Sequence, residues 1–183
     1  MTAQAGIFIV AELEGELRAR IAATQREHDP RLALLWPPHI TIVGSSGVGP
    51  LLADTRPDEL RAALGPVAAR HSPLSLAFGV PERFPGRDIV MLPLDPHGPV
   101  RALHEDLGAS GLRTYRARYP FTPHCTLTMY PPLSRKRERT LLALRFGEPF
   151  VIARLRVLLT RFPQPAKLLL DLPLGRTDDQ SPF

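Results

Sequence analysis

The amino-acid sequence predicts an α+β fold built from two similar halves. Apolar runs with strand character alternate with segments of helical spacing along the chain. The order of these segments in the second half repeats the order in the first. At 183 residues the chain has the size of one domain, which we expect over 1–175, with halves at 1–80 and 88–173 and a polar tail at 176–183.

The first half is predicted to contain five elements. Its first run is rich in Ile, Val and Phe, as is typical of a strand, and Leu17 and Ile21 are spaced as on one face of a helix. Thr55 and Asp58 resemble a capping box, and Pro57 suits the first turn of a second helix. In order, we expect a strand, a helix, a strand, a helix and a strand at residues 6–10, 15–25, 38–43, 55–70 and 73–79.

The second half is predicted to repeat this order and to add one strand. Ser134 has the residue type that most often caps a helix N-terminus, and a basic run follows it. In order, we expect a strand, a helix, a strand, a helix and two strands at residues 88–94, 99–107, 121–130, 134–145, 151–160 and 167–172.

One short motif occurs in the third element of each half. Residues 38–42 read PHITI and residues 123–127 read PHCTL. The composition predicts only about 0.01 matches to Pro-His-x-Thr-aliphatic by chance. Two matches at equivalent places therefore indicate a duplicated functional feature and not two unrelated structural histidines.

Side chains alternate across a strand, so each motif presents its histidine and its threonine on one face. His39 and Thr41 share a face in the first strand, as do His124 and Thr126 in the second. Imidazole titrates near neutral pH, so one ring can accept a proton while the other donates one. The threonine hydroxyls can donate to phosphate oxygens. The pattern predicts displacement at phosphorus by two histidines, without a metal or another cofactor.

The paired motifs resemble those of the 2H phosphoesterase superfamily, in particular its 2′-5′ RNA ligase (LigT-like) and cyclic phosphodiesterase branch. The segments LAFGVPERFPGRDIVMLPL and YPFTPHCTL are also similar to that family. The resemblance implies two pseudo-twofold lobes of antiparallel sheet with outer helices and a catalytic cleft between them. It places His39 and His124 at the catalytic positions and Thr41 and Thr126 at the phosphate-binding positions.

The resemblance implies opening of a 2′,3′-cyclic phosphate, or of a related cyclic nucleotide phosphate, to a 2′-phosphate. Two alternatives are 2′-5′ ligation of RNA halves and a nucleotide- or RNA-binding module with weak catalysis. Many relatives carry a basic residue shortly after the second motif, where this chain has Met129, which argues against RNA as the substrate. Further candidates for substrate contacts are Trp36, Phe84, Arg116, Arg118 and Tyr130.

Composition limits the remaining possibilities. The formal net charge is +5, which suits a phosphate-bearing ligand such as a nucleotide or an RNA end. Cys125 is the one cysteine, so an internal disulfide is excluded and a reducing, cytoplasmic location is expected. No run approaches the length of a membrane span, and no carboxylate cluster joins the histidines to form a metal site. We expect a monomer without a protein partner.

Overall fold

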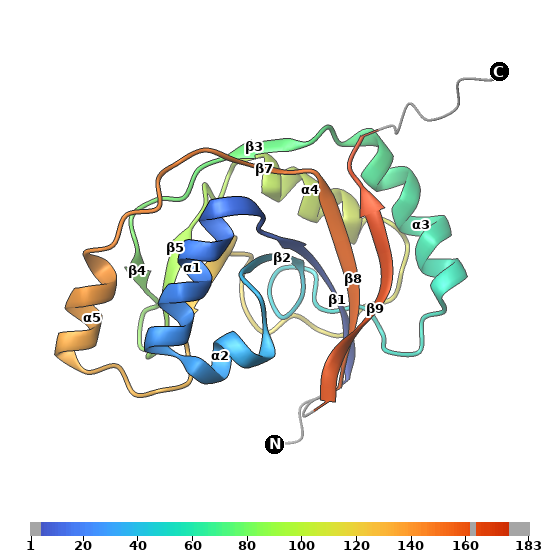
Figure 1. The fold of residues 1–183 in the computed structure, drawn as a ribbon. Coiled ribbons are helices and arrows are strands. Elements are labelled where there is room, and N and C mark those ends of the chain that lie inside the picture. Colours follow the sequence, from blue (N-terminus) through green and yellow to red (C-terminus); the bar gives the residue numbers. More distant parts are fainter. Residues whose placement is uncertain (1–4, 162–163, 176–183) are drawn as a thin grey trace.

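The computed structural model describes residues 5–161 and 164–175 (Figure 1). The predicted polar tail lies outside the described residues. In chain order, the described residues form β1 (Gly6–Glu12), α1 (Gly15–His28), α2 (Pro30–Leu35), β2 (His39–Val43), α3 (Pro57–Arg70), β3 (Leu74–Leu76), β4 (Glu82–Arg83), β5 (Val90–Pro93), α4 (Pro99–Gly108), β6 (His124–Thr128), α5 (Arg135–Leu142), β7 (Phe150–Ile152), β8 (Arg154–Arg161) and β9 (Gln164–Pro173).

The strands pair in antiparallel fashion and confirm the predicted α+β class. One sheet has the order β2-β1-β8-β9, a second has the order β4-β5-β6, and β3 pairs with β7. The two C-terminal strands thus complete the sheet that contains the first motif. Each motif strand lies at an edge of its sheet, and β2 and β6 lie next to each other.

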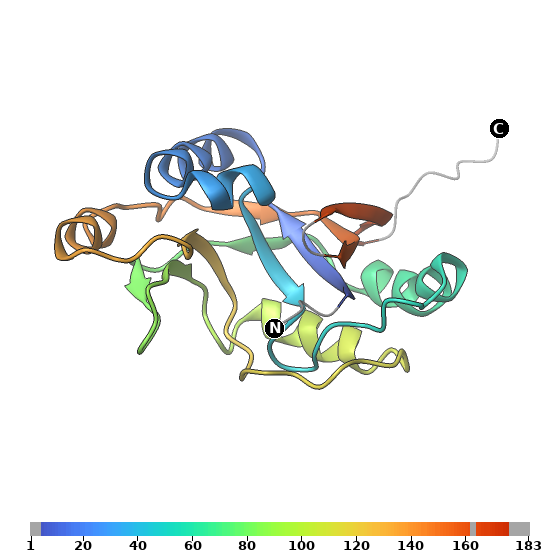
Figure 2. The same cartoon turned by 90° about the horizontal axis from the view of Figure 1, so that it is seen from below.

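Each motif strand is packed against a helix from the other half of the chain. Helix α1 packs on β6 and helix α4 packs on β2, and Figure 2 shows these helices on opposite sides of the sheet. One side chain anchors each helix: Gln25 Nε2 donates to the Thr126 carbonyl at 2.8 Å, and a His104–Ile42 hydrogen bond of 2.7 Å joins Nδ1 to the carbonyl. Both sequence halves are therefore needed to hold each motif.

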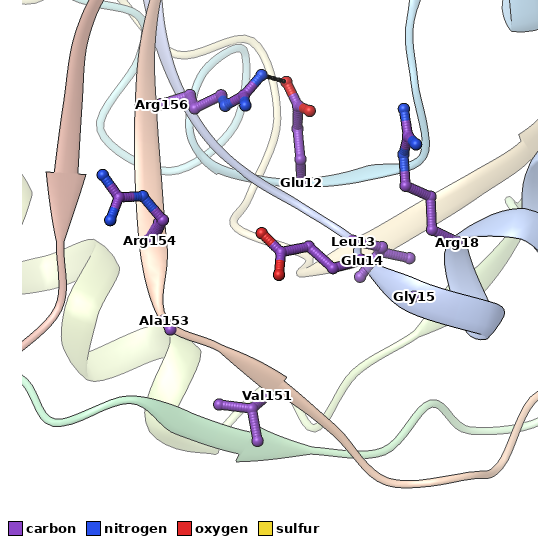
Figure 3. Close-up of a pocket in the computed structure, with 9 residues that line it drawn as sticks. All are labelled: Glu12, Leu13, Glu14, Gly15, Arg18, Val151, Ala153, Arg154 and Arg156. Atoms are coloured by element: carbon purple, nitrogen blue, oxygen red, sulfur yellow. Dashed lines mark hydrogen bonds and ion pairs between the residues drawn. The ribbon is translucent and has the colours of Figure 1, made fainter.

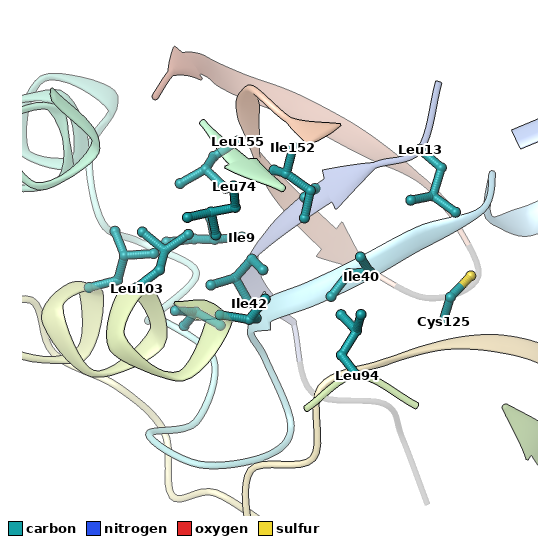
Figure 4. Close-up of a cluster of buried hydrophobic side chains, with 14 of the residues drawn as sticks. Ile9, Leu13, Ile40, Ile42, Leu74, Leu94, Leu103, Cys125, Ile152 and Leu155 are labelled. Carbon is teal, nitrogen blue, oxygen red and sulfur yellow. The ribbon is translucent and has the colours of Figure 1, made fainter. Parts of the chain in front are cut away.

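The apolar faces of the motif strands form the centre of the core. Ile40 and Ile42 are fully buried, and Figure 4 shows Leu94, Leu103 and Cys125 beside them. Both motif strands have the same alternation, in which the histidine and the threonine are half-buried and the residues between them are buried. Burial of the apolar face of each strand therefore determines the direction in which the histidine and the threonine point.

Some expected boundaries are wrong. The capping box of α3 is absent: Arg56 is the N-cap, without a side-chain hydrogen bond, because the Thr55 hydroxyl donates to the carbonyl of Leu52 at 2.9 Å. The expected strand over 121–130 begins only at His124. The Ser134 cap of α5 is confirmed, since its hydroxyl accepts from the Arg137 amide at 3.3 Å.

No helix among the described residues is long and apolar enough to cross a membrane. The longest helices, α1 and α3, have 14 residues each.

Candidate active site

The first motif is held by strand β1. His39 lies directly opposite Glu12, and Thr41 lies directly opposite Val10. The pairing register shifts between Ile9 and Val10, because β2 advances by two residues where β1 advances by one. Directly opposite residues share a sheet face, so Glu12 and Val10 flank the motif side chains.

The second motif is held by strand β5 in the same way. His124 lies opposite Pro93 and Thr126 lies opposite Met91, with a register shift between Val90 and Met91. The shift has the same position relative to the motif as in the first hairpin. The two histidines and the two threonines therefore occupy equivalent places on equivalent hairpins.

Both imidazoles are held by their Nδ1 atoms. His39 Nδ1 lies 2.8 Å from the Pro37 carbonyl oxygen, and His124 Nδ1 lies 2.6 Å from the Thr122 carbonyl oxygen. Because a carbonyl can only accept, each Nδ1 carries the proton. The lone pair of each neutral ring is therefore on Nε2, which acts as a base when free and as an acid when protonated.

Burial lowers the pKa of both motif histidines. For His39 this is opposed by the hydrogen bond to the Pro37 carbonyl and by the negative charge of Glu12. For His124 burial is opposed by the hydrogen bond to Thr122 and reinforced by the charge of His39. The two rings are therefore near enough for the charge of one to affect the other.

An aromatic ring lies against each catalytic candidate. The rings of Trp36 and His39 are 5.6 Å apart and tilted by 43°, and the rings of Phe84 and His124 are 5.1 Å apart and meet edge to face. Two aromatic residues expected to contact substrate are thus neighbours of the histidines. These aromatic rings pack beside the imidazoles and limit their rotation.

Most of the other candidate residues line a cavity of about 390 Å³. Trp36, Tyr130, Arg116 and Arg118 all line it, and so does Met129. Phe84 is not among the lining residues. Further lining residues are Phe8, Leu35, Ser45, Pro50, Tyr115, Thr160, Gln164, Pro165 and Ala166. The cavity combines aromatic rings with two guanidinium groups, which suits a planar ring that carries phosphate.

The loop after β2 holds the arginine-bearing segment in place. The amide of Tyr115 donates to the Pro50 carbonyl at 2.8 Å, and the amide of Arg118 donates to the Ser45 carbonyl at 2.9 Å. Gly49 has a φ of 89°, and a Cβ there would collide with the Tyr115 carbonyl oxygen. The Gly-rich loop therefore serves to support Arg116 and Arg118.

Asp29 is a site-forming residue that the sequence analysis missed. It is fully buried, and its Oδ2 accepts from the amides of Met129 at 2.7 Å and Tyr130 at 2.9 Å. Its Oδ1 caps α2 by accepting from Leu32 at 3.0 Å. One carboxylate thus joins the helix that precedes Trp36 to the end of β6. The Asp-Pro sequence at the start of α2 is the signal that could have revealed it.

Cys125 is part of the core. Burial raises the pKa of its thiol to about 12, although a hydrogen bond with the His39 backbone acts in the opposite direction. A thiol with this pKa is protonated at neutral pH and is not a nucleophile. Its contact with the backbone of His39 joins the two motif strands.

A second cavity, of about 340 Å³, lies at the Glu12 end of β1 (Figure 3). Glu14 and Arg18 line it together with Glu12, whose carboxylate accepts from Arg156 Nη1 at 2.9 Å. The cavity also contains Arg154. Because Glu12 lies opposite His39, this charged cluster borders the first motif.

The chain is similar to one known protein family over most of its length. A family model described as the 2′-5′ RNA ligase superfamily matches residues 13–161. The chain belongs to the 2′-5′ RNA ligase superfamily. The resemblance to the 2H phosphoesterases inferred from the paired motifs is thereby confirmed at the level of the family. No curated protein matches the chain by sequence.

Solved structures with the fold of this superfamily are similar over nearly the whole chain. E. coli LigT complexed with 3′-AMP has a TM-score of 0.61 at 18% identity, covering 95% of this chain and all of LigT. A structure described as a phosphoesterase has a TM-score of 0.61 at 17% identity with the same coverage. Kluyveromyces marxianus Usb1 has a TM-score of 0.50 at 14% identity and covers 94% of this chain and 99% of Usb1. These similarities confirm the LigT-like fold.

The described residues of this superfamily member contain no group of three or more His, Cys, Asp or Glu side chains arranged to hold a metal ion.

The relation of the two whole lobes by a pseudo-twofold axis stays a prediction, because the equivalence of the two halves is established only for the two motif hairpins.

Proposed function

We propose that this protein is a phosphodiesterase that opens a 2′,3′-cyclic phosphate, or a related cyclic nucleotide phosphate, to a 2′-phosphate without a metal. The observation that carries the proposal is the equivalent placement of two imidazoles with Nδ1 bound to the backbone. This arrangement leaves the lone pair of each neutral ring on Nε2, where it can serve in proton transfer.

The reaction needs one proton acceptor and one proton donor. Nε2 of one histidine takes a proton from the attacking water while a bond forms between the water oxygen and phosphorus. Nε2–H of the other histidine gives its proton to the 3′-oxygen as the P–O3′ bond breaks. The hydroxyls of Thr41 and Thr126 share a face with the histidines and donate to the non-bridging oxygens, where negative charge increases.

The size and lining of the larger cavity support a nucleotide as ligand. A cavity of about 390 Å³ is in the range of pockets that hold small molecules. The Arg31 guanidinium lies 4.3 Å from the centroid of the Tyr130 ring and holds that ring in place. E. coli LigT, which has the same fold, is known in complexes with 3′-AMP, NADP+ and ATP.

The superfamily description favours ligation as a second candidate. In ligation a 5′-hydroxyl would replace water as the nucleophile, forming a 2′-5′ phosphodiester as the P–O3′ bond of the cyclic phosphate breaks. An RNA substrate would need an extended basic surface, and exposed Arg135, Lys136 and Arg139 on α5 offer one.

The test is to incubate the purified protein, with chelator present, with 2′,3′-cyclic mononucleotides and with an RNA that ends in a cyclic phosphate. We expect a nucleoside 2′-phosphate as the product from the mononucleotide. Joined RNA strands as the main product would favour the ligase. Binding of a nucleotide monophosphate without turnover of any cyclic substrate would identify a binding module and overturn the proposal.

A further inference from the structure

We propose that Glu12 is a positioning residue that places the proton of the singly protonated histidine pair on His39, so that His39 acts as the general acid and His124 as the general base. This inference rests on the function proposed above. It concerns the two otherwise equivalent histidines and explains how their roles differ.

The geometry places a fixed carboxylate beside only the first motif. Glu12 lies directly opposite His39 on the same face of the sheet, a relation in which the two Cβ atoms are about 5 Å apart. The Glu12 side chain is only 18% exposed, and Arg156 Nη1 holds its Oε1 at 2.9 Å (Figure 3). A partly buried and anchored carboxylate acts on its neighbour more strongly than an exposed one.

The equivalent place beside the second motif carries no charge. Pro93 lies opposite His124, and the ring of Phe84 covers it edge to face. The charged group that acts on His124 is His39 itself, and because this repulsion is mutual it favours neither ring. On the other side, the charge of Glu12 acts to raise the pKa of His39.

Other groups near His39 do not reverse this difference. From β8, Arg156 is paired with Glu12 and reduces its effect without removing it. From the segment after α2, the neighbour is the uncharged Trp36 ring, and from β6 it is His124. Burial lowers the pKa of both rings, so the charge of Glu12 is the difference that favours His39 in the state with one proton on the pair.

This assignment gives a complete cycle. His124 Nε2 removes the proton from water, and His39 Nε2–H protonates the leaving 3′-oxygen. After the step His124 carries a proton and His39 does not, so the two histidines still hold one proton in total. The charge of Glu12 then favours return of the proton to His39 through solvent, which restores the starting state.

The experiment is a pH titration of the imidazole resonances by NMR in the full-length protein labelled at histidine. His39→Gln and His124→Gln assign the two resonances. We expect His39 to titrate at a higher pH than His124. Glu12→Gln should lower the midpoint of His39 by about 0.5–1 pH unit, given the size of an interaction between partly buried charges.

Glu14→Gln is the matched control, because Glu14 lines the same cavity but is exposed and has no place opposite His39. It should leave both midpoints unchanged. If Glu12→Gln does not fold, Arg156→Gln provides a second test. Because Arg156 is the partner of Glu12, its removal should raise the titration midpoint of His39, whereas removal of Glu12 should lower it.

Kinetics supply an independent readout. On a 2′,3′-cyclic mononucleotide, Glu12→Gln should move the alkaline limb of the kcat profile, which reports the acid, to lower pH. Absence of turnover in the wild type would defeat the proposed function, while the NMR midpoints would still test where the proton lies. A His124 midpoint above that of His39, or an unchanged His39 in the Glu12→Gln protein, would overturn the inference.

Discussion

His39 and His124 donate the same hydrogen bond, each from Nδ1 to the carbonyl oxygen of the residue two positions earlier. The backbone itself therefore selects the tautomer and orients both rings. Each bond lies at the start of a strand whose partner carries a register shift at the same relative position. The site depends on two edge strands, each anchored by a helix from the other half of the chain.

Stability should fall on mild acidification. Burial lowers the pKa of His39, His104 and His124 in the folded state, below the value near 6.5 of the unfolded chain. The unfolded state then binds more protons as the pH falls below about 6.5, so the stability present above that pH is progressively lost. Tm measured between pH 8 and pH 5 should show this decline.

The decline in Tm should be less steep in a His39→Gln/His124→Gln double variant, which lacks two of the three imidazoles with a lowered pKa. His97→Gln, at an exposed position, serves as the control and should keep the wild-type slope. Equal slopes in the double variant and in the wild type would contradict a contribution from the two motif histidines.

Asp29→Asn should destabilise the protein by about 2–3 kcal/mol, because a buried charged acceptor of several hydrogen bonds is lost. Urea unfolding followed by circular dichroism measures this change. Asp58→Asn is the control, since Asp58 forms an exposed pair with Arg56 and should cost less than about 1 kcal/mol. Similar losses for the two variants would mean that Asp29 does not anchor the end of β6.

Gly49→Ala should both destabilise the protein and weaken nucleotide binding. Gly49 and Gly111 have similar φ values of 89° and 83°, so alanine at either position costs about 1 kcal/mol in backbone strain. At Gly49 the new Cβ also meets the Tyr115 carbonyl oxygen, whereas at Gly111 it meets no atom within 4 Å. A larger loss of stability and a raised KM are expected for Gly49→Ala alone, measured by thermal unfolding and steady-state kinetics.

Arg116→Ala/Arg118→Ala should raise KM for a cyclic mononucleotide by about 5- to 30-fold, which corresponds to about 1–2 kcal/mol of lost binding. Because these residues line the cavity and not the motif, kcat should change little. Arg135→Ala/Arg139→Ala removes two exposed charges from α5 and is the matched control. An equal rise in KM for the two double variants would indicate a general effect of net charge.

The sequence alone predicted the features that depend on residues close together in the chain. Alternation along His39–Val43 and His124–Thr128 predicted which side chains face the core, because burial of Ile40 and Cys125 leaves little choice. The duplicated order of elements predicted that the motifs are equivalent, and their hairpins have the same register. The Ser134 cap was also predictable from residue type.

What the sequence did not reveal depends on contacts between distant segments. Asp29 binds backbone amides about 100 positions away, and the pairing of Glu12 with His39 arises only when β1 meets β2. The supporting role of Gly49 follows from the approach of the Tyr115 carbonyl. The capping box failed because the Thr55 hydroxyl has a nearer acceptor in the preceding turn.

The central claim is that His39 and His124 act on one phosphorus, and a double-mutant cycle tests it most directly. The rate on a 2′,3′-cyclic mononucleotide is measured for the wild type, His39→Gln, His124→Gln and the double variant, with folding checked by circular dichroism. Groups that act as a unit are not additive, so each single change should lower kcat by about 10²–10⁴-fold and the double change by little more. Losses that multiply in the double variant, or a single variant that retains the full rate, would contradict the account.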